Sequence, residues 1–220
     1  MSPQEKENQQ RSHLCDTHTE EIASALTHGI ATLLSIWGLV AMVLVSDGDP
    51  IRVVSSSLFG LCLILLYGSS TLYHIVTKPK TKALFQTFDH ICIYLLIAGS
   101  YTPLTLVGLG GAWGWSIFGI VWACAIAGVL LKTVGKGKKD SKLSTILYLV
   151  MGWIIIVAIK QLIANVPAEG IAWIVAGGVT YSLGVIFYVW EKLPYNHAIW
   201  HLFVLGGSAC HVIAFTNYVL

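Results

Sequence analysis

Seven long apolar runs, separated by short polar breaks, constrain the fold of this chain more than any other feature. Crossing the hydrocarbon core of a bilayer, about 30 Å thick, takes about 20 apolar residues in a helix. Each run approaches or exceeds that length, and the breaks contain glycine, proline or clustered charges, which end helices. We therefore predict seven transmembrane helices, at 22–46, 52–77, 83–108, 112–132, 143–164, 168–190 and 197–219.

The composition indicates that lipid is the solvent for most of this chain. Hydrophobic residues make up 55% of the 220 residues, charged residues only 11%, and the mean hydropathy is +0.73. A soluble domain carries about 25% charged residues, so this chain has too few charges to cover a surface that faces water. The net charge of +2 is too small to indicate a nucleic-acid partner. The five cysteines form no CxxC pair and predict neither a zinc module nor a redox motif.

The seven spans leave few residues for any other domain. Residues 1–21 are polar and contain no apolar segment of a signal peptide, so we predict a cytosolic N-terminal tail. Residues 22–220 then form a single all-α domain, a polytopic seven-transmembrane helix bundle.

The distribution of lysine and arginine predicts the orientation of the bundle. Cytoplasmic loops of membrane proteins carry an excess of these residues. If the N-terminus is cytoplasmic, the cytoplasmic segments hold eleven of the 13 lysines and arginines. The opposite side then holds only Arg52 and Lys160. We therefore predict a cytoplasmic N-terminus and a C-terminus on the outer side.

Several polar residues lie inside the predicted spans, where polar side chains are costly and often functional. Helices 1, 3 and 7 start at the cytoplasmic side and helix 2 ends there. The polar residues near those helix ends should therefore share one depth in the membrane, although they are far apart in sequence. They are Glu21, His28, Ser70, His74, Asp89, His90, His197 and His201.

The types and spacing of these residues fit a metal site. His197 and His201 are four residues apart, so both imidazoles lie on one face of a helix. With His74 they supply three histidine ligands, and three ligands with an open fourth position describe a catalytic zinc site. Asp89 would then be a carboxylate near the water in that position. Ser70, one turn before His74, would support the site.

The histidines could instead have structural roles that involve no metal. A single histidine in a membrane helix commonly forms a hydrogen bond to a neighbouring helix, and we expect this for His211. We expect His90 near the membrane interface. Capping and packing would explain Glu21 and His28, whose roles the sequence does not decide.

Five segments form a combination that is more specific than any one of them. They are EEIASALTHG at 20–29, SSTLYH at 69–74, FDH at 88–90, AGSYTP at 98–103 and PYNHAIWHLFVLGGSACH at 194–211. With these segments the chain resembles the haemolysin III family, the bacterial branch of the progestin and adipoQ receptor membrane proteins. The likeness covers nearly the whole chain. Position 24 departs from it, because relatives often have asparagine where this chain has Ser24.

The resemblance implies a location, a metal and an activity. It implies a multi-pass protein of the bacterial inner membrane, with Zn²⁺ held by His74, His197 and His201 and completed by a water or hydroxide. The family's aspartate and serine near the metal correspond to Asp89 and Ser70. Some relatives have ceramidase-like activity, which implies membrane lipids as partners and no obligate protein partner.

Three functions are compatible with the sequence. The first is a zinc-dependent hydrolase that cleaves a lipid amide or ester bond and serves membrane lipid and fluidity homeostasis. The second is a membrane sensor in which zinc is structural, held by four protein ligands without water. The third is the pore-forming cytolysin that the family name suggests, although a secreted toxin needs an export route and a soluble form.

Reporter fusions test the predicted orientation. A reporter fused after Lys80 should be active in the cytoplasm, and one fused after Leu220 should be active on the outer side, because the loop charges divide eleven to two. A cytoplasmic signal from the fusion at Leu220 would contradict an odd number of spans with this orientation.

Overall fold

Seven membrane-crossing helical segments make up the structure, as predicted. The computed structural model describes residues 17–134, 142–190 and 192–220. Within those ranges all regular secondary structure is helical, and seven helical segments are long and apolar enough to cross a membrane. The all-α fold is therefore confirmed. Most of the predicted tail and residues 135–141, in the segment between the fourth and fifth predicted spans, lie outside the described residues.

Four of the spans are uninterrupted helices, and three contain a change of helical type. The uninterrupted spans are α2 (His18–Val45), α3 (Pro50–Ile75), α5 (Gly111–Val134) and α8 (Ala168–Val189). The others are α4 (Pro79–Pro103) with η1 (Leu104–Leu109), α6 (Lys142–Gly152) with η2 (Ile154–Ala158) and α7 (Ile159–Asn165), and α9 (Asn196–Ala214) with η3 (Phe215–Val219).

Local chemistry explains where the first helices begin. The Thr17 side chain accepts a hydrogen bond from the Glu20 amide, and the Glu20 carboxylate accepts one from the Thr17 amide. This capping box satisfies two backbone donors and starts α2 at His18, four residues before the predicted span. Asp49 caps α3 in a similar way, and Pro50 occupies the first turn, where its missing N–H costs nothing.

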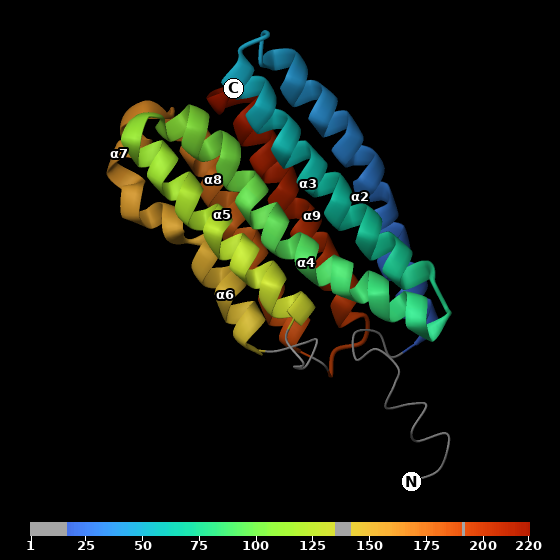
Figure 1. The fold of residues 1–220 in the computed structure, drawn as a ribbon. Helices are drawn as coiled ribbons and strands as arrows, with labels where there is room; N and C mark the ends of the chain where they lie inside the picture. The colour runs from blue at the N-terminus through green and yellow to red at the C-terminus, as the bar shows by residue number, and fades with distance from the viewer. Residues whose placement is uncertain (1–16, 135–141, 191) are drawn as a thin grey trace, which may run out of the picture.

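The last span runs through the middle of the bundle. In Figure 1, α9 (red) lies between the α2–α3 pair and α8, and α4 crosses in front of it. The start of α2 and the end of the chain lie at opposite ends of the bundle, as seven crossings require. Arg52, at the start of α3, donates a hydrogen bond to the carbonyl of Leu220. The bundle places the start of α9 beside the start of α2.

The outer and inner faces of α2 have opposite characters. Large apolar side chains such as Leu33, Trp37 and Leu44 are 69%, 69% and 75% exposed. The inner face carries small and polar residues, and Ser24 and His28 are almost fully buried. Exposed apolar side chains with buried polar ones suit a helix that faces lipid outside and protein inside. This pattern supports a protein that is embedded in a membrane.

Hydrogen bonds from α4 and α7 stabilise two interrupted spans. The Tyr101 hydroxyl donates to the carbonyl of Gly152 (2.9 Å) and accepts from the amide of Ile155 (3.0 Å), which lies just beyond the end of α6. Asn165 donates to the carbonyl of Leu109, at the end of η1 (2.9 Å). Backbone groups freed by a break in a membrane helix need such partners.

One close contact between α4 and α5 depends on a glycine. A Cβ atom added to Gly128 would lie 2.4 Å from Cε1 of Tyr94, and the Tyr94 ring is only 1% exposed. The ring also packs against Tyr148, with centroids 4.5 Å apart. Because the ring is enclosed, it has little room to move away.

Replacing Gly128 by alanine should destabilise the protein. Overpacking a filled core costs about 1–3 kcal/mol, which should exceed the helix propensity gained, about 1 kcal/mol. Gly119→Ala on the same helix is the matched control, since no atom lies within 4 Å of its added Cβ. Thermal unfolding in detergent should show a lower Tm for Gly128→Ala and an unchanged or higher Tm for Gly119→Ala. Equal Tm values for the two variants would contradict this packing.

Candidate metal centre

The three histidines predicted as metal ligands come together inside the bundle. His74 lies at the end of α3, and His197 and His201 lie in the first turns of α9. All three are buried, with exposed fractions of 5%, 2% and 0%. One ring nitrogen of each lies within 4.8 Å of the others, so the group could hold a metal ion. The shared depth predicted from the spans is confirmed for these residues.

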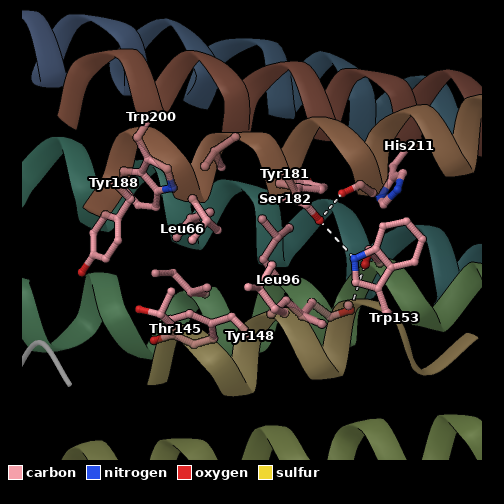
Figure 2. A pocket seen from close by; sticks show the side chains of 18 of the residues that line it. Leu66, Leu96, Thr145, Tyr148, Trp153, Tyr181, Ser182, Tyr188, Trp200 and His211 are labelled. Carbon is pink, nitrogen blue, oxygen red and sulfur yellow. Dashed lines mark hydrogen bonds between the residues drawn. The ribbon is translucent and has the colours of Figure 1, made fainter. Parts of the chain in front are cut away.

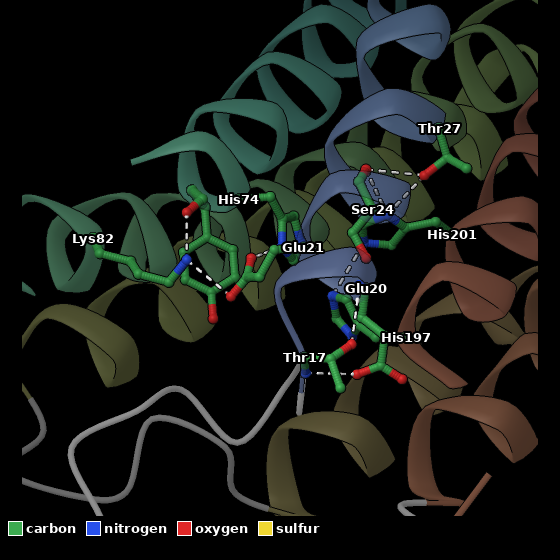
Figure 3. Close-up of polar contacts among 10 residues, drawn as sticks. Thr17, Glu20, Glu21, Ser24, Thr27, His74, Lys82, His197 and His201 are labelled. Carbon is green, nitrogen blue, oxygen red and sulfur yellow. Dashed lines mark hydrogen bonds and ion pairs between the residues drawn. The ribbon is translucent and has the colours of Figure 1, made fainter. Parts of the chain in front are cut away.

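Helix α2 supplies the partner of His74 (Figure 3). Nδ1 of His74 lies 2.7 Å from Oε2 of Glu21. A carboxylate can only accept hydrogen bonds, so Nδ1 carries the proton and donates it. In a neutral ring this leaves the lone pair on Nε2, the nitrogen available to a metal.

Helix α2 also supplies the partners of His201. Its Nδ1 lies 3.3 Å from the carbonyl of Ser24 and 3.2 Å from the hydroxyl of Thr27. That hydroxyl donates to the same carbonyl (2.9 Å). Nδ1 of His201 is therefore the donor, and Nε2 carries the lone pair in a neutral ring.

The donor set fits zinc. Nε2 of His201 lies 3.1 Å from Nε2 of His197, close to the separation of about 3.3 Å between ligands of a tetrahedral zinc with bonds near 2.0–2.1 Å. Two lone pairs at this distance repel each other unless a cation or a proton lies between them. Neutral imidazoles are common zinc ligands, and three of them are typical of a catalytic site.

His28 packs on this group without joining it. Its ring stacks on the His201 ring, with centroids 3.4 Å apart and an interplanar angle of 10°. The edge of the His28 ring contacts Tyr67 at 4.9 Å. Neither of its nitrogens has a hydrogen-bond partner within the described part of the chain. The sequence left its role open, and in the structure the His28 ring lies flat against the ring of a candidate ligand.

The other predicted site residues are also buried. Ser70 is fully buried one turn before His74 on α3. Asp89 and His90, on α4, are 1% and 4% exposed. The hydroxyl of Tyr148 donates to the carbonyl of His90 (3.1 Å). The proximity of Asp89 or Ser70 to a bound metal stays a prediction.

Glu20 fixes the start of α9, which carries two of the histidines. Its Oε1 accepts a hydrogen bond from the amide of Tyr195 at 2.5 Å. Tyr195 has a left-handed backbone, with φ of +57°, and its hydroxyl donates to Thr19 at 3.1 Å. The adjacent glutamates of α2 therefore have different partners: Glu20 contacts the α9 start, and Glu21 contacts His74.

An apolar cavity of about 140 Å³ lies between α3, α4, α6, α8 and α9. Trp200 and Tyr188 line one end, and Trp153 and His211 line the other (Figure 2). The Trp200 ring lies 4.9 Å from the His197 ring and 5.1 Å from the His201 ring. Trp200 therefore packs against two of the three histidines and also lines the cavity.

His211 lies on α9 well after His197 and His201, and it lines the cavity. Its Nε2 donates to the carbonyl of Ile174 on α8 (3.3 Å), which confirms the predicted bond between helices. Its ring packs against Tyr181, with centroids 5.5 Å apart. The hydroxyl of Tyr181 is hydrogen-bonded to that of Ser208 at 2.7 Å, and the Ser208 hydroxyl is also hydrogen-bonded to that of Tyr67.

Sequence reasoning missed two residues, one that contacts a histidine of the group and one that contacts the partner of another. From the sequence, Lys82 is only one of the eleven cytoplasmic charges, but its ammonium lies 3.0 Å from Oε1 of Glu21, the partner of His74. Thr27 had no assigned role, yet its hydroxyl contacts His201. The available signal was the spacing of Glu21, Ser24 and His28, which recur at intervals of three and four residues near one face of α2.

Comparison with known proteins identifies the family. Residues 17–212 match a family model described as Haemolysin-III related. The chain belongs to the haemolysin III family. This confirms the resemblance drawn from the five sequence segments, and together with the seven spans it establishes a multi-pass membrane protein.

Proteins similar to this chain occur in bacteria and animals. The chain is 48% identical to "Hemolysin-3" of Bacillus cereus over 203 residues, which cover 91% of this chain and 92% of the relative. It is also 48% identical to the "Hemolysin-3 homolog" of Bacillus subtilis (strain 168) over 195 residues, covering 88% and 91%. The human "Monocyte to macrophage differentiation factor" is 28% identical over 206 residues, covering 91% and 84%. The last match supports the wider relationship to the progestin and adipoQ receptor type.

Removal of any one of the three histidines should abolish metal binding. Purified protein is expected to hold about one zinc per chain, since three imidazoles leave one position open. His74→Ala, His197→Ala and His201→Ala should each lose it, whereas His18→Ala, at the exposed start of α2, should retain it. Elemental analysis of protein purified without added metal measures this. Full zinc occupancy in the His201→Ala protein would contradict the assignment.

Proposed function

We propose that this chain is a zinc-dependent hydrolase of the bacterial inner membrane that cleaves an amide or ester bond of a lipid. The observation that carries the proposal is a buried group of three histidines beside an apolar cavity. The nitrogens of the histidines lie within 4.8 Å of one another, and Trp200, which packs against His197 and His201, also lines the cavity. A metal site at the end of an apolar cavity suits a substrate with an acyl chain.

The cavity would bind the acyl chain and exclude water. Its lining is mostly aliphatic and aromatic, with hydroxyls from Tyr101, Thr145 and Ser182. A chain bound there would place its carbonyl at the Trp200 end, nearest to the histidines. Held in this way, the scissile bond would be oriented before the reaction begins.

The proposed hydrolysis divides the work among a few residues. Zinc, when bound by His74, His197 and His201, supplies a Lewis acid and lowers the pKa of a coordinated water. Asp89 would take a proton as water attacks the carbonyl and would return it to the leaving nitrogen or oxygen. The products are a fatty acid and the amine or alcohol of the lipid. Ser70, buried one turn from His74, would support the ligand helix.

In the cell this reaction would adjust membrane lipid composition and fluidity. Its partners would be membrane lipids, and it would need neither nucleic acid nor an obligate protein partner.

Two alternative functions follow from the same family. A non-enzymatic sensor with structural zinc would keep the metal and lack turnover. A cytolysin is the weaker alternative: "Hemolysin-3" names the Bacillus cereus relative, but the outer faces of these helices suit lipid, not a soluble toxin.

Replacing Asp89 by asparagine should separate the enzyme from the sensor. Asparagine has nearly the same size but cannot take a proton, and a general base contributes about 10²–10⁴-fold to the rate. Asp89→Asn should therefore retain zinc and lose fatty-acid release by that factor. The experiment measures zinc content and released fatty acid from a mixture of lipid amides and esters in detergent.

The matched control is Asp47→Asn, in the exposed turn between α2 and α3. Asp47 has a left-handed backbone, with φ of +50°, which asparagine tolerates. This variant should match the wild type in zinc content and turnover. Equal turnover in Asp89→Asn would exclude Asp89 as the base, and metal-loaded wild type without turnover on any lipid would favour the sensor.

A further inference from the structure

We propose that Glu21 is the positioning residue of the metal centre, and that Lys82 holds its carboxylate in place. This inference rests on metal binding by the three histidines, as in the proposed function. It concerns the residues behind the ligands and not the reaction itself. It also gives separate roles to the two adjacent glutamates at the start of α2.

The contact between Glu21 and His74 fixes both the tautomer and the direction of the ring. Oε2 of Glu21 lies 2.7 Å from Nδ1 of His74, whose side chain is fully buried. Because the carboxylate accepts the Nδ1 proton, Nε2 is left as the metal-binding nitrogen. The hydrogen bond also restricts rotation of the ring, so the lone pair stays directed at the other two histidines. Histidine ligands of metals are commonly held by a carboxylate in this way.

Lys82 holds the carboxylate from the other side (Figure 3). Its ammonium lies 3.0 Å from Oε1 of Glu21, so the two carboxylate oxygens have different partners. The ammonium also donates to the carbonyl of Tyr73 (3.1 Å) and lies 4.7 Å above the Tyr73 ring centroid. The side chains of Glu21 and Lys82 are only 17% and 21% exposed. An ion pair so little exposed is screened less by solvent than a surface pair.

These contacts join three helices at one end of the bundle. Glu21 comes from α2, His74 from α3 and Lys82 from the first turn of α4. An ion pair between Glu21 and Lys82 that is purely structural would also join these helices, but it would have no effect on metal binding. The two roles differ in one measurable property: positioning changes the metal affinity of the folded protein, whereas a structural ion pair changes only stability.

The test compares metal affinity among full-length variants stripped of metal. Glu21→Gln keeps the size of the side chain but removes the charge, and its one amide oxygen can replace only one of the two carboxylate oxygens that face His74 and Lys82. Removing a partner of a metal-binding histidine typically weakens affinity by about 10–100-fold, and we expect a loss in this range for Zn²⁺ and Co²⁺. Competition with a chromophoric chelator measures affinity, and the Co²⁺ absorption spectrum reports ligand geometry.

Two variants serve as matched controls. Glu169→Gln removes the same charge from an exposed residue in the first turn of α8. Lys80→Met removes a lysine that is exposed two residues before Lys82. Both should bind metal with wild-type affinity. The Tm of each metal-free protein is measured separately, so that a loss of stability is not mistaken for a loss of affinity.

A double-mutant cycle tests the role of Lys82. Lys82→Met should weaken metal affinity in the wild-type background and should have no further effect in the Glu21→Gln background, since it acts through that carboxylate. If Glu21→Gln does not fold, Lys82→Met alone decides the question. Wild-type affinity in folded Glu21→Gln or Lys82→Met would overturn this inference and leave the metal centre intact. Failure of the wild type to bind any metal would overturn both proposals.

Discussion

The histidine group depends on hydrogen bonds that helix α2 makes to the outer nitrogens of two rings. Glu21 accepts from His74, and the Ser24 carbonyl with the Thr27 hydroxyl accepts from His201. An imidazole N–H buried in a membrane bundle without a partner is costly. Once these protons are bound on the outer side, the lone pairs of neutral rings must lie on the inner side. The first turns of α2 therefore determine which ring nitrogen His74, at the end of α3, and His201, near the start of α9, can offer to a metal.

The rest of the fold keeps these helix ends together. Glu20, at the start of α2, accepts a hydrogen bond from the amide of Tyr195, the residue before α9. Lys82 of α4 forms an ion pair with Glu21 in the same turn of α2. On α9, Trp200 packs against His197 and His201 and lines one end of the cavity, and His211 lines its far end. The interruption of the fifth span beside Tyr101 shapes the cavity wall, since Gly152 and Trp153 line it. Binding of an acyl chain and binding of a metal would thus take place on adjoining parts of one helix.

The spans and the meeting of the three histidines could be predicted from the sequence because both depend on simple periodic or chain-length constraints. Seven apolar runs with polar breaks fix seven crossings, and the alternation of helix direction then places His74, His197 and His201 at one depth. Pairing within the bundle could not be predicted, because lipid-facing and protein-facing apolar residues have similar side chains. The contacts of Glu21 with His74 and Lys82 depend on that pairing. The break after Gly152 had no proline to mark it, and its stability comes from Tyr101 on another helix.

We propose that His74, His197 and His201 bind one zinc ion through ring nitrogens and leave a position open. X-ray absorption at the zinc edge of the purified protein tests it most directly, since it reports the type, number and distance of the ligands. We expect about three imidazole nitrogens at about 2.0–2.1 Å and one further oxygen, with no sulfur near 2.3 Å. A spectrum with four protein ligands and no water, with sulfur ligands, or without bound zinc would contradict it.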